Sequence, residues 1–136
     1  MIETTSKSSE RFPVEDVRAF ATAVCAKVGM EPEVALAVAD GLLEADLYGH
    51  VTHGLALLPD YVEELDNGTM TATGRPTVLS DFAAVALWAG NRLPGVWTTK
   101  LAVAEAITRA RKFGVGAVAV RRSHHIACLA AYLEQP

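Results

Sequence analysis

Cysteine is scarce in this chain, and its scarcity excludes a disulfide-stapled fold. The two cysteines, Cys25 and Cys128, stand far apart among 136 residues, without the close spacing of metal-binding or redox-active pairs. Both fall in segments whose pattern predicts helix. We therefore expect two reduced, buried thiols, as is usual for a cytoplasmic protein.

Basic residues are not in excess, and long apolar runs are missing. The chain has 12 Lys and Arg against 16 Asp and Glu, for a net charge of −4, and no basic cluster is interleaved with aromatics as in nucleic-acid-binding proteins. The apolar run 82–89 is far too short to cross a bilayer, and residues 1–10 lack the apolar core of a secretory signal. We expect neither a nucleic-acid nor a membrane partner.

What the chain does have is the composition of a globular protein, with 51% hydrophobic and 21% charged residues. Residues 1–12 read as a disordered lead-in. Apolar residues then recur at helical spacing, which predicts a helical segment over 13–68 with helices at 13–29, 32–49 and 52–65. In the third helix Thr52 is the predicted N-cap, and Pro59 is expected to kink or divide the helix. Pro32 suits the first position of the second helix.

The pattern changes after Gly68 and predicts the first part of an α/β domain over 69–136. Short apolar runs predict strands at 76–80 and 83–89, a long helix at 94–113 that Gly114 ends, a strand at 115–120, and a last helix from about Ile126. The strands at 83–89 and 115–120 are expected to be buried, with the helix between them as a crossover. The predicted inward-facing residues are Val17, Phe20, Ala21, Val24 and Val28, then Val34, Val38, Leu42 and Ala45, then Val96, the stem of Lys100, Val103, Ala104, Ile107 and Ala110.

All four histidines fall in two short segments where regular elements end, His50–His53 and His124–His125. Histidine exchanges protons near neutral pH, so this pattern indicates a site for proton chemistry. Gly54 would let backbone approach a ligand, and chain leaving the carboxyl end of a buried strand often forms active sites. Asp46 could orient His50 or His53, or could be a solvated acid at a helix end.

Motifs spread along the chain resemble the type-2 malate/L-lactate dehydrogenase family. They are Ala45-Asp46 with Gly49, Thr52-His53-Gly54 where the family usually has Ser-His-Gly, Tyr61, Ala106-Ile107 with Ala110, Gly114-Val115-Gly116, and Ser123-x-His125 ahead of Tyr132. The resemblance runs from Val17 to Tyr132. It implies a mixed α/β, non-Rossmann fold, and because family members are much longer, this chain resembles their N-terminal portion.

The family's activity is the NAD- or NADP-dependent reduction of 2-oxoacids, or their formation from 2-hydroxy acids. The resemblance implies the acid/base role for His53, with His125 as the second catalytic candidate. We also expect substrate contacts at Thr52, Gly54 and Ser123. The resemblance implies a homodimer and cofactor contacts that lie mostly outside this chain. No residue here is assigned to the cofactor.

This sequence departs from the family at two positions. Many members carry an arginine four residues after the motif histidine, where it could clamp the substrate carboxylate, and here that residue is Leu57. Either another cation binds the carboxylate or the substrate is less acidic. The glycine that often follows the Ser-x-His motif is Ala127 here.

Two other functions compete with the enzyme. The chain could be a non-catalytic remnant or an interaction domain. It could also be a metal-dependent hydrolase built on His50-x-x-His53, but no third ligand is evident and zinc sites use three or four. The sequence therefore predicts no metal site.

Overall fold

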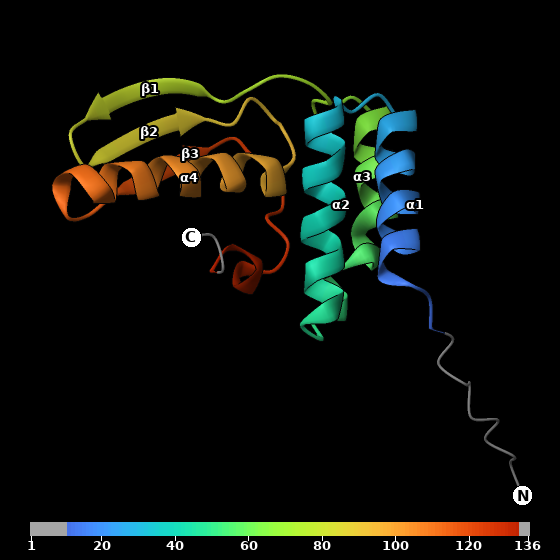
Figure 1. Ribbon diagram of the computed structural model, residues 1–136. Helices are drawn as coiled ribbons and strands as arrows, with labels where there is room; N and C mark the ends of the chain where they lie inside the picture. The colour runs from blue at the N-terminus through green and yellow to red at the C-terminus, as the bar shows by residue number, and fades with distance from the viewer. Residues whose placement is uncertain (1–10, 134–136) are drawn as a thin grey trace, which may run out of the picture.

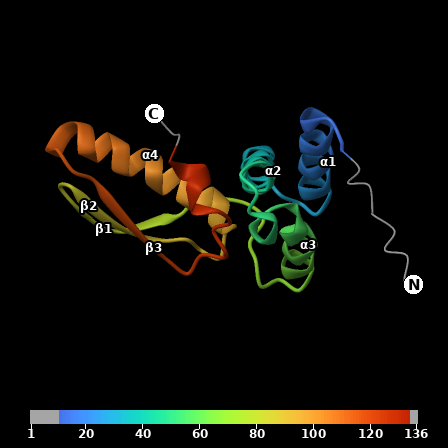
Figure 2. The ribbon, with the colours of Figure 1, turned by 90° about the horizontal axis from the view of Figure 1, so that it is seen from below.

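Three helices lie side by side in the first half of the computed structural model, which describes residues 11–133 (Figures 1 and 2). They are α1 (Val14–Lys27), α2 (Pro32–Leu47) and α3 (Leu58–Asp66). The predicted disordered lead-in falls almost entirely on residues 1–10, outside this range. Pro32 stands in the first turn of α2, where its missing N–H costs nothing because no carbonyl awaits it.

Helix α2 supplies the centre of the core. Its predicted inward face, Val34, Val38, Leu42 and Ala45, is fully buried. On α1 the buried residues are Ala21 and Cys25, whereas Phe20, predicted to face inward, is 66% exposed. The apolar stripe of α1 is therefore narrower than predicted, because α1 packs against α2 along the line of its small residues.

The third predicted helix is broken into three pieces. Two short 3-10 helices, η1 (Val51–His53) and η2 (Leu55–Leu57), precede α3. Thr52 was predicted to be an N-cap, and this was wrong, since Thr52 lies inside η1 and its side chain caps no helix. Pro59 does not kink a helix but occupies the first turn of α3, where proline is favoured.

A three-stranded sheet of order β1-β2-β3 forms the second half. Strands β1 (Thr77–Phe82) and β2 (Val85–Ala89) form an antiparallel hairpin, and β3 (Ala117–Arg121) pairs with β2 in parallel. The parallel pair is joined by the crossover helix α4 (Gly95–Phe113), which lies along one face of the sheet (Figure 2). Gly114 ends α4 in the left-handed conformation, with φ of 82°, as predicted.

Close packing of α4 on β3 depends on a glycine. A methyl group at Gly116 would overlap the carbonyl oxygen of Ala106 in α4. Arg109, also on α4, is 8% exposed and ties the helix to the hairpin by donating to Asp81 and to the carbonyl oxygens of Ala83 and Val85. These contacts fix the crossover and thereby the direction in which the chain leaves β3.

The predicted burial of the strands was wrong for most positions. In β3 the side chains alternate between exposed and half-buried, and in β2 only Ala86 is buried. The reason is that, within residues 11–133, α4 covers one face of the sheet and nothing covers the other. The inward face of α4 also differs, since Trp97, Thr98, Ala102 and Arg109 are buried while Lys100 and Ala104 are exposed.

The predicted last helix is shorter and starts later than expected. The chain leaves β3 in an extended loop and forms only a 3-10 helix, η3 (Leu129–Tyr132). Cys128 precedes η3 and is therefore not helical, but both cysteines are free and buried as predicted.

Candidate active site

The two predicted catalytic histidines come together from distant parts of the chain. His53 lies at the end of η1 and His125 in the loop after β3, and their ring centroids are 5.3 Å apart with an angle of 37° between the ring planes. Both side chains are exposed in the described chain. Each imidazole can therefore be reached from solvent.

The turn that carries His53 is held by a carboxylate. The backbone N–H of Leu55 donates to Oδ2 of Asp46 at 2.9 Å. Gly54 lies against the same carboxylate, and a methyl group there would overlap Oδ1. Asp46 thus binds neither histidine and is not a simple solvated acid. Its carboxylate fixes the backbone next to His53, and Gly54 is the residue that leaves room for it.

The ring nitrogens of the two histidines have different partners. Oγ1 of Thr52 lies 2.9 Å from Nδ1 of His53, and a hydroxyl can either donate to or accept from that nitrogen. Nδ1 of His125 accepts from the backbone N–H of Ala127 at 3.1 Å. Since an accepting nitrogen carries no proton, neutral His125 has its proton on Nε2.

Buried residues that the sequence did not identify as site residues anchor the His125 loop. The hydroxyl of Tyr61, which is 3% exposed, donates to the carbonyl oxygen of His125 at 3.2 Å. Burial raises the pKa of Tyr61 well above its usual value, so the phenol remains a donor. A methyl group at Gly95 would overlap the carbonyl oxygens of His124 and His125. The motif position of Tyr61 was the one available signal for this anchor.

Ser123, predicted to contact substrate, is engaged within the protein. Its Oγ lies 2.7 Å from Oγ1 of Thr98, a residue that is 1% exposed and donates to the carbonyl oxygen of Gly95. Because the single proton of Thr98 is then used, Ser123 is the donor of the pair. Ser123 therefore joins the start of the loop to α4 and keeps its oxygen lone pairs for other donors.

His124 contacts α3 and the segment after it, and it has a structural role. Its Nε2 lies 3.0 Å from the carbonyl oxygen of Thr69, and its Nδ1 lies 3.0 Å from Oε2 of Glu64. These contacts tie the loop after β3 to the end of α3 and the segment that follows it. Three sets of contacts thus hold the loop after β3: the hydrogen bond from Tyr61, the contact of Ser123 with α4, and the contacts of His124 with Glu64 and Thr69.

Comparison with known proteins identifies the family of the chain. The family model described as malate/L-lactate dehydrogenase matches residues 12–136. The chain belongs to this family. It is 32% identical over 129 residues to hydroxycarboxylate dehydrogenase B of Escherichia coli O157:H7, covering 95% of this chain and 36% of that protein.

A second relative and a solved structure support the same assignment. The malate dehydrogenase of Pyrococcus abyssi is 36% identical over 115 residues, covering 85% of this chain and 32% of its own length. The crystal structure of malate dehydrogenase from Entamoeba histolytica superposes with a TM-score of 0.87 at 29% identity, covering 90% of this chain and 34% of that one. The chain thus spans about one third of the length of the relatives it matches.

A cavity of about 280 Å³ lies beside His53. His50, His53, Ala127, Cys128, Leu129 and Ala130 line it. Ligand cavities for drug-sized molecules start at roughly 300 Å³, so this one suits a small ligand. Leu57, the residue in place of the family's arginine, is half-buried and packs against the hydrophobic core.

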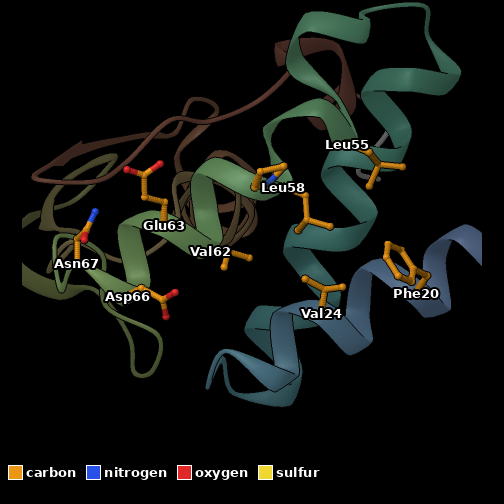
Figure 3. Close-up of a pocket in the computed structure, with 9 residues that line it drawn as sticks. Phe20, Val24, Leu55, Leu58, Val62, Glu63, Asp66 and Asn67 are labelled. Atoms are coloured by element: carbon orange, nitrogen blue, oxygen red, sulfur yellow. The ribbon is translucent and has the colours of Figure 1, made fainter.

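A larger hollow of about 640 Å³ lies between α1 and α3, on the other side of the η2 turn (Figure 3). Its wall is apolar, with Phe20, Val24, Leu58 and Val62, and its polar rim carries Glu63 and Asp66. Those carboxylates would repel an anionic substrate, and no histidine lines it. An anionic ligand is therefore better accommodated beside His53 than in this hollow.

Two further findings concern the described residues. Within 11–133 no three His, Cys, Asp or Glu side chains gather closely enough to hold a metal ion. No helix in the same range is long and apolar enough to cross a membrane.

Proposed function

We propose that this chain supplies the proton donor and part of the substrate site of an NAD- or NADP-dependent oxidoreductase that interconverts small 2-oxoacids and 2-hydroxy acids. The observation that supports this most is the meeting of His53 and His125, two family-motif histidines, at 5.3 Å beside a small cavity. The names of the relatives, hydroxycarboxylate and malate dehydrogenases, indicate the substrate class.

Reduction of a 2-oxoacid needs a hydride for the carbonyl carbon, a proton for the carbonyl oxygen and a group that binds the carboxylate. The nicotinamide cofactor supplies the hydride when it is bound. At the start of α4 the carbonyl oxygens of His124 and His125 lie against Gly95, and these oxygens would repel the phosphates of the cofactor from that helix end. We assign no cofactor contact to this chain.

His53 suits the role of proton donor better than His125. When His53 is protonated, Nδ1–H can donate to Thr52 while Nε2–H is left for the substrate oxygen, and after Nε2 has given up its proton Nδ1–H still donates to Thr52. His53 can therefore gain and lose a proton without losing its partner. Protonation of His125 at Nδ1 would instead break the hydrogen bond from the N–H of Ala127. We infer that the ring of His125 is oriented to donate a hydrogen bond from Nε2.

The experiment is an assay of the complete natural polypeptide that carries these residues. NADH and NADPH oxidation would be followed at equal enzyme concentration with pyruvate, oxaloacetate and a heat-inactivated control. Turnover of at least one 2-oxoacid supports the proposal. A folded polypeptide that shows neither turnover with either cofactor nor binding of oxamate, an unreactive 2-oxoacid analogue, would overturn it and favour a non-catalytic role.

A further inference from the structure

His50 shares a cavity with the proposed proton donor. The family motifs assign no role to His50, and the structure places it before η1, in the loop after α2. It nevertheless forms part of the wall of the same 280 Å³ cavity as His53. Resting on the proposed function, we propose that the imidazole of His50 binds the substrate carboxylate, the role left open by Leu57.

The backbone fixes His50 relative to His53. The N–H of His50 donates to the carbonyl oxygen of Ala45 at 2.8 Å, and its own carbonyl oxygen accepts from the N–H of His53 at 2.8 Å. Both backbone groups of His50 are therefore engaged, one with the last turn of α2 and one with the proton donor itself. Two imidazoles held in one turn can contact two ends of one small molecule.

The lining of the cavity leaves few groups that could bind an anion. Besides the two histidines it consists of Ala127, Cys128, Leu129 and Ala130. Among the described residues that line it, the imidazoles alone have side-chain N–H groups, which carboxylates require. His53 is assigned to the carbonyl oxygen, so His50 remains for the carboxylate. An imidazole presents an N–H in either of its protonation states.

Four arginines of the described residues are engaged elsewhere, and none of them lines the cavity. Arg92 donates to the carbonyl oxygen of Gly68, and Arg75 pairs with Glu33. Arg18 pairs with Asp40, and Arg109 is held beneath the hairpin by Asp81 and Glu105. An imidazole in place of a guanidinium makes one hydrogen bond to a carboxylate where an arginine makes two. The site would then hold the carboxylate more weakly and accept it in more orientations.

The test is steady-state kinetics of the complete natural polypeptide with a 2-oxoacid that it reduces. Removal of a hydrogen bond to a charged group predicts that His50→Ala raises KM about 10- to 100-fold while kcat changes less than about threefold. The dissociation constant of oxamate, measured by calorimetry, should rise by a similar factor. His50→Arg should restore both values, because a guanidinium also binds a carboxylate.

Two controls separate carboxylate binding from a general disturbance of the turn. Val51→Ala changes a neighbouring side chain that is 63% exposed and should leave KM unchanged. Pyruvamide, the uncharged amide of pyruvate, should react with wild type and His50→Ala at similar kcat/KM. If His50→Ala does not fold by circular dichroism, His50→Leu takes its place, because leucine also lacks an N–H in its side chain.

The outcomes distinguish this proposal from the proposed function. A wild type that neither turns over a 2-oxoacid nor binds oxamate overturns both. A wild type that is active, with an unchanged KM and unchanged oxamate binding in His50→Ala, overturns the role of His50 alone. Equal losses with pyruvate and pyruvamide would also contradict it, since they would show that the charge of the substrate does not matter.

Discussion

Replacement of Gly54 by alanine should reveal how Asp46 holds the turn that carries His53. A methyl group at position 54 would overlap Oδ1 of Asp46, so the carboxylate must move away from the N–H of Leu55. The backbone of Gly54 has φ of −95° and ψ of −150°, a conformation that alanine also adopts. The cost of Gly54→Ala therefore comes from the displaced carboxylate and not from the backbone.

The size of the effect follows from the hydrogen bond that is lost. A hydrogen bond to a charged group contributes about 1.5–3 kcal/mol, so Gly54→Ala should lower the free energy of unfolding by about that amount. Asp46→Ala removes the same bond and should cost about as much. Once Asp46 has been replaced, the methyl group at position 54 meets no carboxylate. The second substitution should then cost almost nothing.

A double-mutant cycle measures this coupling. Urea unfolding of wild type, both single variants and the double variant, followed by circular dichroism, gives four free energies of unfolding. We expect the double variant to be more stable than the sum of the single losses predicts, by about 1.5–3 kcal/mol. Additivity within about 0.5 kcal/mol, the ordinary result for independent sites, would refute the argument that Gly54 is required by Asp46.

Three further predictions concern the loop, the core and the extent of the chain. Gly95→Ala should lower the free energy of unfolding by about 1–3 kcal/mol, since its methyl group would displace the carbonyl oxygens of His124 and His125. The control is Lys100→Ala, at an exposed position of the same helix, which should change the free energy of unfolding in urea by less than about 0.5 kcal/mol. Burial raises the pKa of Cys25 to about 11 from 9.0, so the thiol of the unfolded chain loses its proton at lower pH than that of the folded chain. The free energy of unfolding should therefore fall as the pH rises from about 9 to about 11, and it should fall less steeply in Cys25→Ala. Parallel curves of unfolding free energy against pH for wild type and Cys25→Ala would contradict this. Residues 1–136 expressed alone should not oxidise NADH or NADPH with 2-oxoacids, since they span about one third of the length of their relatives; oxidation above a heat-inactivated control would show that these residues suffice.

Most element boundaries could be predicted from the sequence because they depend on local chemistry. Pro32 marks the start of α2 and Gly114 the end of α4, each for a steric reason that operates within a few residues. The three strands followed from short apolar runs. Their burial did not, because an apolar run indicates what a strand can pack against, whereas exposure depends on which elements cover it.

The site was predictable only in part. Motif resemblance identified His53 and His125, but their separation of 5.3 Å depends on how the loop after β3 returns to η1. The anchoring of that loop by Tyr61 and Gly95 is a tertiary property, and the motif position of Tyr61 was its one signal in the sequence. His50 illustrates the same limit, since its place in the cavity follows from the 3-10 turn that replaced the predicted N-cap at Thr52.

The most direct test of the central claim compares kcat for His53→Ala and His125→Ala in the complete natural polypeptide. Loss of general acid catalysis predicts that His53→Ala lowers kcat roughly 10²–10⁴-fold, while the dissociation constant of the reduced cofactor stays nearly unchanged because hydride and proton come from separate groups. Equal damage from His125→Ala would mean that the two imidazoles share the proton. A near wild-type kcat in His53→Ala, with His125→Ala alone impaired, would contradict the account and move the proton donor to the loop after β3.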